Sequence, residues 1–258
     1  MILRELEGGM DQQVLSRRKF IFFCVILFLA GCEVYRIPVD GKNAEEVYLE
    51  AENLLREGDF EDAGKKFRDV DTYFPCSSKA STAQIMSAYC SFRSGSYEDS
   101  IRELDVFLRY HPSHGMVPYS LYLKALSKYM MMSKVGRDST QAKDAKKVFI
   151  ELINRFPTSK YAKDSQKRIV ILDDILAAHE LVVGRYYQKK KSYLAAINRY
   201  NCVVSRFPNT KSAEEAFFRI TECCRNEGLL EEENNAASVL KAKFPNGKWV
   251  KKLDKLKR

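Results

Sequence analysis

The chain contains 258 residues, of which 43 are basic and 34 acidic, so its formal net charge is +9. Such a basic balance would suit nucleic-acid binding, but no reader motif with interleaved aromatic residues accompanies it, and we expect no nucleic-acid partner. From residue 43 onward the sequence has no low-complexity run, no strand-type alternation and no second composition, which favours a single helical domain.

Residues 1–31 have the pattern of a secretory signal peptide. The basic run Ser16–Lys19 precedes the apolar run Phe20–Leu29, and a helix of this length reaches only about 15 Å, half the thickness of a hydrocarbon core. The following Leu29-Ala30-Gly31-Cys32 resembles the bacterial lipobox, in which the cysteine carries a diacylglycerol and an N-acyl chain as the first residue of the mature protein. We therefore predict lipidation at Cys32; an ordinary cleavage site beside an incidental cysteine is the alternative.

Two features of this leader leave alternatives open. Met10 could serve as the start in place of Met1, and the residues from Ser16 to Phe20 also resemble a twin-arginine export motif, although the strongly apolar core favours ordinary secretion.

Glu33 stands where an aspartate would resemble the inner-membrane retention signal, which implies the periplasmic face of the outer membrane. Residues 32–42 are predicted to form a short tether, followed by a helix that begins after an N-cap at residue 43.

Residues 43–247 are predicted to form about five helix-turn-helix repeats, at 43–77, 78–114, 115–159, 160–210 and 211–247. Each repeat contains a proline near its end, because proline stops a helix and disfavours helical geometry in the residue before it. The five prolines are Pro75, Pro112, Pro157, Pro208 and Pro245. Small residues recur 24 and 12 positions before these prolines and bulky apolar residues 8 positions before them, with the fifth copy the weakest. This spacing resembles the tetratricopeptide repeat.

The repeat resemblance implies an all-α fold, a right-handed superhelical solenoid of about five tetratricopeptide-like repeats that bury their apolar faces on one another. The distances between the prolines are 37, 45, 51 and 37 residues, longer than the usual unit of about 34, so inserts are expected around 115–137 and 160–175. A generic helical bundle with chance prolines is the alternative. The last segment, 248–258, is basic and amphipathic, with Trp249, Leu253 and Leu256, and is predicted to be a tail or a cap over the last repeat.

The sequence lacks the patterns of a catalytic or metal site. It has only three histidines, no phosphate-binding glycine loop, no nucleophile elbow and no metal-binding helix pair. We therefore predict that the protein is not an enzyme, binds no metal and has no cofactor besides the covalent lipid on Cys32. The five cysteines that follow Cys32 contain no Cys-x-x-Cys pair and are expected to be mostly small buried residues, with one disulfide as an open alternative.

Together the lipobox, the tether and the repeats resemble the BamD (ComL) family of outer-membrane β-barrel assembly lipoproteins. The stretches that carry the resemblance are Arg109–His114 with Tyr119 and Tyr122, Arg137–Ala142, Arg155–Tyr161 with Asp164, Arg168 and Leu172, Leu176–Ala177 with Glu180, Tyr186–Tyr187, and Ala195–Arg199. The resemblance implies a lipid-anchored scaffold of the β-barrel protein assembly (BAM) complex. Its amino-terminal repeats would meet the C-terminal signal of unfolded outer-membrane β-barrel proteins, and its carboxy-terminal repeats would dock a periplasmic POTRA domain of BamA.

Two groups of residues are candidates for these contacts. The partner-binding candidates are Arg168, Glu180, Tyr186, Tyr187 and Arg199. The client-binding candidates are Tyr89, Phe92, Tyr119 and Tyr122. For the three charged residues, which stand on otherwise apolar helices, the alternative is ion pairing between helices that fixes how the third and fourth repeats stack.

Other functions share parts of this pattern. Another periplasmic repeat lipoprotein, for pilus assembly, cell division or peptidoglycan, would share the lipobox and the repeats but lack the long stretch 155–199. A regulatory or peptidoglycan-binding subunit of an envelope enzyme is a third alternative. The large partner that co-purifies with the protein from membranes would separate the three.

Overall fold

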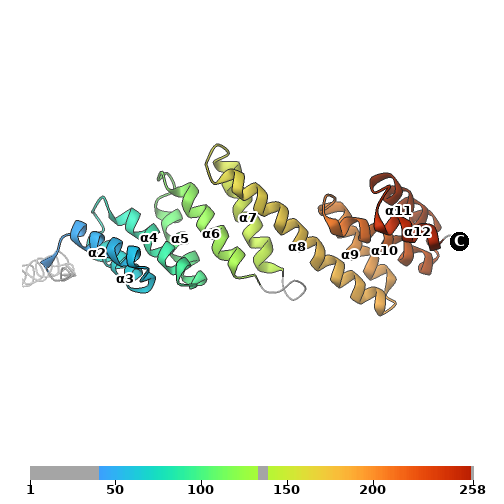
Figure 1. Ribbon diagram of the computed structural model, residues 1–258, viewed down its shortest axis with the longest axis horizontal. Helices are drawn as coiled ribbons and strands as arrows, with labels where there is room; N and C mark the ends of the chain where they lie inside the picture. Colours follow the sequence, from blue (N-terminus) through green and yellow to red (C-terminus); the bar gives the residue numbers. More distant parts are fainter. Residues whose placement is uncertain (1–40, 133–138, 257–258) are drawn as a thin grey trace, which may run out of the picture. The chain divides into compact units, whose positions relative to one another are not determined.

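This computed structural model describes residues 41–132 and 139–256. The leader, Cys32 and most of the predicted tether lie outside these ranges. The described residues form α-helices and contain no β-strand (Figure 1). The helices are α2 (Ala44–Glu57), α3 (Phe60–Tyr73), α4 (Ala80–Arg93), α5 (Tyr97–Tyr110), α6 (Val117–Met130), α7 (Thr140–Arg155), α8 (Ala162–Lys189), α9 (Tyr193–Arg206), α10 (Lys211–Glu227), α11 (Leu230–Lys243) and α12 (Lys248–Leu256).

The helices pack in the order in which they follow one another in the chain. Within the described ranges α2 pairs with α3, α4 with α5, α6 with α7, α8 with α9 and α10 with α11, and each pair also packs against the next (Figure 1). The first helices of neighbouring pairs touch as well, as α4 does with α6 and α8 with α10. This succession confirms the prediction of an all-helical repeat fold. The right-handed superhelical course stays a prediction.

The ends of the helices follow the predicted signals. At the start of α2 the Asn43 side chain accepts hydrogen bonds from the N–H groups of Glu45 and Glu46, and the Glu46 carboxylate accepts one from the Asn43 N–H. This reciprocal arrangement is a capping box. At the other end of the second helices, Phe207 leaves helical geometry with φ −132° and ψ 49° directly before Pro208. The residues that end the second helix of each pair in this way are Phe74, His111, Phe156, Phe207 and Phe244.

Small residues allow the paired helices to approach each other closely. In the fourth pair Gly184 of α8 lies against the ring of Tyr200 of α9, and a Cβ atom at Gly184 would come within 2.7 Å of the Cδ1 atom of that ring. Tyr200 and the neighbouring Ala196 are fully buried. The equivalent positions of the other pairs are also buried, and they are Ala51, Ala63, Phe67, Ala88, Ser100, Leu104, Ala145, Phe149, Thr221, Glu233 and Ala237. The predicted register of the repeats is thus confirmed at these positions, while Ser133 lies outside the described residues.

The insert expected around 160–175 belongs to one continuous helix. Helix α8 is 28 residues long, twice the 14 residues of α9, and it contains no proline and only one glycine, Gly184. Its first half contacts α6 and α7 through Arg168 and Asp173, and its second half contacts α9 and α10 through Glu180 and Arg185. The extra residues of the fourth repeat therefore lengthen its first helix. None of the described helices, α8 included, is long and apolar enough to cross a membrane.

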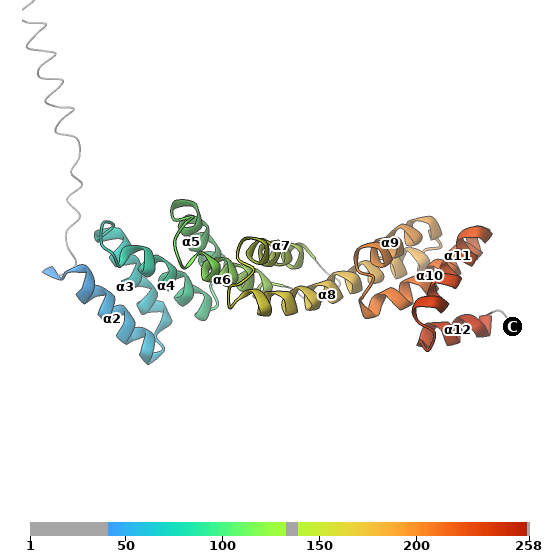
Figure 2. The same cartoon turned by 90° about the horizontal axis from the view of Figure 1, so that it is seen from above.

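Helix α12 covers an apolar surface of α10 and α11 (Figure 2). The Trp249 N–H in its first turn donates a hydrogen bond of 2.7 Å to the Glu214 carboxylate of α10, which supplies both a cap and a favourable charge at the helix N-terminus. The Trp249 ring lies 5.0 Å from the Phe218 ring, and the Arg219 guanidinium lies 5.1 Å from the Trp249 ring. At Gly247 a Cβ atom would come within 2.6 Å of the Glu214 carboxyl carbon, so a larger residue there would displace the carboxylate that caps α12.

Candidate partner-binding surface

The centre of the candidate surface is an ion pair between α8 and α9. The Arg199 guanidinium donates a hydrogen bond of 3.3 Å from Nη1 to Oε2 of Glu180. The Glu180 side chain is only 10% exposed, whereas that of Arg199 is 48% exposed. Glu180 therefore holds one edge of the guanidinium against the helix pair, and the rest of Arg199 faces solvent. Since both residues belong to the fourth pair, this ion pair joins two helices of one repeat and not the third repeat to the fourth.

Aromatic side chains stand next to this ion pair. Tyr187 and Arg199 line one depression of about 250 Å³ together with Ala195, Asn198 and Cys202. The neighbouring Tyr186 is 59% exposed, and its ring meets that of Tyr187 edge to face at 5.6 Å. Exposed tyrosines and arginines of this kind are enriched where proteins bind one another. Four of the five predicted partner-binding residues thus lie together.

The fifth, Arg168, lies elsewhere on α8. Its Nε atom donates to Oδ2 of Asp164 at 2.6 Å, and its guanidinium lies 6.0 Å from the Tyr122 ring of α6. The Tyr122 hydroxyl donates to the same Asp164 oxygen at 2.6 Å. This hydrogen bond, followed by that from Arg168, holds the pKa of Asp164 below its ordinary value. Arg168 therefore joins α8 to α6. This is a contact between the third and fourth repeats, as the alternative explanation of this charged residue predicted.

The client-binding candidates lie on two helices that touch, α4 and α6. Tyr89, Phe92 and Tyr119 all pack against one buried apolar cluster formed by Ala88, Leu104 and Leu123. Tyr122 is separate from that cluster; its ring stacks on that of Tyr161 at 5.1 Å, and Tyr119 meets Tyr161 at 5.5 Å. All four candidates are partly buried. They contribute apolar area to the packing of the repeats and also expose part of each ring.

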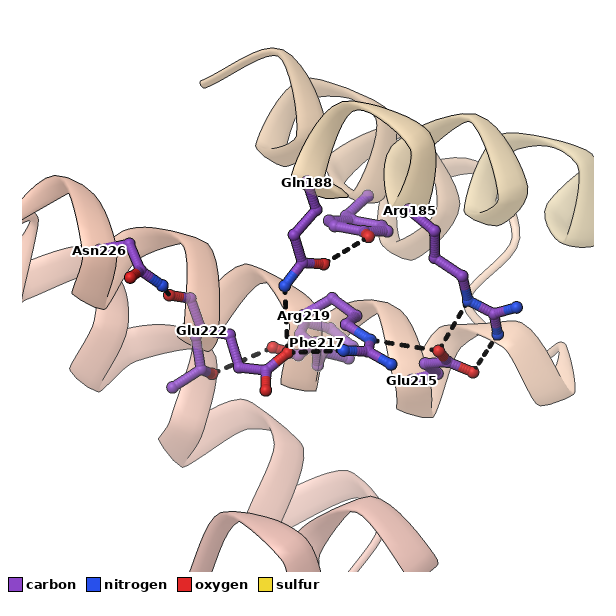
Figure 3. Close-up of polar contacts among 9 residues, drawn as sticks. Arg185, Gln188, Glu215, Phe217, Arg219, Glu222 and Asn226 are labelled. Atoms are coloured by element: carbon purple, nitrogen blue, oxygen red, sulfur yellow. Dashed lines mark hydrogen bonds and ion pairs between the residues drawn. The ribbon is translucent and has the colours of Figure 1, made fainter. Parts of the chain in front are cut away.

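A polar network that was not predicted joins α8 to α10 (Figure 3). Arg185 binds both carboxylate oxygens of Glu215, with distances of 2.9 and 2.5 Å. The Arg219 guanidinium bridges Glu215 at 3.2 Å and Glu222 at 2.9 Å. Glu215 is only 8% exposed, and two arginines compensate its charge. The network therefore fixes how the fourth and fifth pairs stack.

The same network reaches the packing of α9. Gln188 donates to the Glu222 carboxylate at 3.2 Å and accepts a hydrogen bond of 2.8 Å from the Tyr200 hydroxyl. Burial of the Tyr200 hydroxyl raises its pKa, so it stays protonated and donates throughout the physiological range. In the sequence only the spacing Glu215, Arg219, Glu222 on one helix face could have revealed part of this network.

The fold defines a class: all-helical proteins built from stacked helix-turn-helix repeats. Residues 40–252 match a family described as YfiO, outer membrane lipoprotein. An "Outer membrane protein assembly factor BamD" from Rickettsia prowazekii is 36% identical over 86% of this chain and 89% of its own length. The protein of the same name from Caulobacter vibrioides is 30% identical over 86% of this chain and 74% of its own length. That from Neisseria meningitidis serogroup B is 31% identical over 81% of this chain and 82% of its own length. The chain belongs to the YfiO family of outer membrane lipoproteins.

Solved structures with helical repeats are more distant. The TPR2AB domain of yeast Sti1, in a complex with pHSP90, has a TM-score of 0.40 and 13% identity, and the alignment covers 79% of this chain and 78% of that one. PilW, a type IV pilus biogenesis factor, has a TM-score of 0.36 and 11% identity over 81% of this chain and 97% of its own. At these TM-scores neither likeness bears on function.

Proposed function

We propose that this protein is a non-catalytic, lipid-anchored scaffold of the outer-membrane β-barrel assembly complex and that it binds a periplasmic POTRA domain of BamA through Arg199, Tyr186 and Tyr187. Membership of the YfiO family and the similarity to outer membrane protein assembly factors support a role in outer-membrane protein assembly. The observation that carries the assignment is the half-exposed Arg199, held by buried Glu180 beside exposed Tyr186.

This arrangement suits recognition of an acidic group. A guanidinium has five N–H donors, and Glu180 accepts one of those of Arg199. Among the described residues no second carboxylate pairs with Arg199, so a carboxylate of the partner can bind its free edge in the fork geometry that arginine favours. Glu180 reduces the cost of ordering the long arginine side chain, because the ion pair already restricts it in the free protein.

Co-purification from detergent-solubilised membranes tests the proposal. Arg199→Ala should lower the amount of BamA retained by a tagged full-length chain about tenfold, the effect of losing a central interface arginine. The same change leaves Glu180 buried without its partner, at a cost of about 1–3 kcal/mol, so loss of stability must be separated from loss of contact.

Two matched variants make that separation. Glu180→Gln keeps Arg199 and should retain BamA, whereas the double variant Arg199→Ala/Glu180→Gln removes the unpaired charge and should still lose BamA while its helical circular-dichroism signal and melting temperature match those of Glu180→Gln. Retention of BamA by the double variant would refute the assignment of Arg199. Co-purification of a pilus, cell-division or peptidoglycan-related partner in place of BamA would support the alternative functions.

The proposed anchor is a diacylglycerol and an N-acyl chain on Cys32, which lies outside the described residues. Several acyl chains hold a protein at a bilayer because each buried methylene contributes about 0.8 kcal/mol. A Cys32→Ala variant should move from the membrane fraction to the soluble periplasmic fraction. Membrane partitioning that equals that of the wild type would contradict lipid anchoring at this residue.

We propose further that unfolded outer-membrane proteins meet the exposed edges of Tyr89, Phe92, Tyr119 and Tyr122. The support is their position on the two neighbouring helices α4 and α6, with part of each ring accessible. A fluorescent peptide corresponding to the C-terminal end of a barrel precursor should bind Tyr89→Ala more weakly than wild type. Tyr110→Ala is the control, since Tyr110 is 71% exposed on α5 and outside this group. Equal binding by both variants would remove the assignment.

A further inference from the structure

A groove with a basic rim lies between α7 and the C-terminal end of α9. Its volume is about 320 Å³. The residues that line it are Lys143, Lys146, Lys147, Ile150, Leu176, Arg206 and Phe207. The four cationic side chains come from two helices of neighbouring repeats, and none of the described residues that line the groove is acidic.

Three of the four cations have no acidic partner in the described part of the chain. Lys146 forms an ion pair with Asp173, but Lys143, Lys147 and Arg206 pair with no described carboxylate. Arg206 lies 3.9 Å from the Cys202 sulfur, and its guanidinium lies 5.7 Å from the ring of the adjacent phenylalanine. All three residues are exposed, and together they concentrate uncompensated positive charge at one place.

Lysines that are largely buried between neighbouring helices pair with carboxylates. Lys124 pairs with Asp105 at 2.5 Å, and Lys128 pairs with Asp144 at 3.7 Å, in each case across two helices. Lys146 of the groove follows the same rule, whereas the more exposed Lys143 and Lys147 have no carboxylate partner among the described residues. An anionic partner would supply the missing counter-charges and would gain from several cations at once.

The floor of the groove is apolar. Leu176 and Phe207 are 4% and 6% exposed and form its base, and Ile150 is 39% exposed at its side. An occupant that fills the groove must insert an apolar side chain as well as offer anions to the rim. The flat surface of an anionic membrane could meet the rim but would leave this recessed base uncovered. A protein segment can satisfy both.

We infer that this groove binds a short acidic segment of a partner protein, in which aspartate or glutamate residues flank a bulky apolar side chain. The apolar side chain packs on Phe207, Leu176 and Ile150, and the carboxylates pair with Lys143, Lys147 and Arg206. The inference does not rest on the proposed binding of BamA, because the two lysines of α7 lie outside the surface formed by Arg199 and its neighbours.

A peptide that alternates glutamate with leucine is the probe, and its binding to the full chain in detergent micelles is followed by fluorescence anisotropy. Lys143→Glu/Lys147→Glu should weaken binding about tenfold or more, because two surface ion pairs are lost and repulsion replaces them. Lys251→Glu/Lys255→Glu is the matched control. It makes the same change of charge at two exposed helical positions four residues apart, on α12, and should change binding less than about twofold.

Two further measurements separate the contributions of charge and groove. Replacing the leucines of the probe by serine should weaken binding even though the charge is unchanged, and higher salt should weaken binding of the original peptide. Equal binding by the two double variants, or equal binding of the serine peptide, would overturn the inference. It would also be overturned if Lys143→Glu/Lys147→Glu lost binding to phosphatidylglycerol vesicles, relative to phosphatidylcholine vesicles, while still binding the peptide. Co-purification of BamA reports on Arg199 separately, so the two proposals can fail independently.

Discussion

The close contact between Gly184 and Tyr200 predicts that a larger residue at position 184 disturbs the packing of α8 on α9 and lowers stability. In Gly184→Ala the new Cβ atom would lie 2.7 Å from Cδ1 and 2.9 Å from Cζ of the Tyr200 ring, and closer still to Cε1. The ring has little room to withdraw, because Tyr200 is fully buried and its hydroxyl donates to Gln188 at 2.8 Å. The substitution should therefore behave as overpacking of a core.

The expected change in the free energy of unfolding of Gly184→Ala is the sum of two opposing effects. Overpacking costs up to about 3 kcal/mol, and the better helix propensity of alanine returns about 1 kcal/mol, so Gly184→Ala should lower the free energy of unfolding by about 2 kcal/mol. For a domain of this size that corresponds to a melting temperature about 4–8 °C lower. Thermal and urea unfolding followed by circular dichroism at 222 nm measure both quantities.

A second background isolates the steric effect. In Tyr200→Leu the ring is absent, and Gly184→Ala should then be neutral or stabilising by up to about 1 kcal/mol, since only the propensity gain remains. If Gly184→Ala stabilised the wild-type chain to the same extent as it stabilises Tyr200→Leu, the close approach of the two helices would be refuted.

Three other predictions concern a hydrogen bond, the thiols and the C-terminal helix. Tyr122→Phe should lower stability at neutral pH by about 1 kcal/mol. The pKa of Asp164 is depressed chiefly by the Tyr122 hydroxyl, so this contribution is present above the ordinary value of 3.8 and is lost as the pH falls through the lower folded-state pKa. Urea unfolding of both chains in a series from pH 7 downward should show the stability difference shrink at the acidic end. Exposed Cys76 should react with N-ethylmaleimide long before buried Cys223, whose pKa burial raises to about 12, as peptide mass spectrometry can follow. Glu214→Ala should speed hydrogen exchange in α12 without changing exchange in α2, because the carboxylate caps α12.

Controls and contrary outcomes complete these tests. Tyr129→Phe should not share the pH dependence of Tyr122→Phe, since Tyr129 meets Arg168 only through its ring. A stability difference that stays constant throughout the acidic series would show that Asp164 is not the acceptor that matters. Equal labelling rates for the thiols of Cys76 and Cys223 would contradict the burial of Cys223. Unchanged hydrogen exchange in α12 of Glu214→Ala would contradict the capping of α12 by Glu214.

Much of the fold could be predicted because repeat packing imposes local rules on the sequence. Pro208 ends α9 at Phe207 through its own ring and missing N–H, so no tertiary information is needed. Gly184 and Ala196 are small because their neighbours in the repeat are close, and small residues recur at the same spacing from the proline in the other copies, apart from Glu233 in the fifth. The course of α8 was harder to predict, since proline-to-proline counting indicates extra residues without assigning them to a helix or a loop.

The candidate surface was predictable only in part. Tyr187 and Arg199 could be grouped through the family resemblance, and the structure places them around one depression. Arg168 could not be separated from them, because its contacts with Tyr122 depend on how the third pair lies on α8. The bridge from Arg185 to Glu215 connects residues 30 positions apart on different helices, and no local spacing rule predicts such a pair.

The most direct test of the proposed function places a photo-crosslinker at Tyr186, which is 59% exposed beside Arg199. With p-benzoylphenylalanine at this position in living cells, irradiation should yield a crosslink to BamA, and the crosslink should disappear in the Arg199→Ala/Glu180→Gln background. The same group at Tyr110, on α5, should give no BamA crosslink. A crosslink to BamA from Tyr110 but not from Tyr186 would contradict the account.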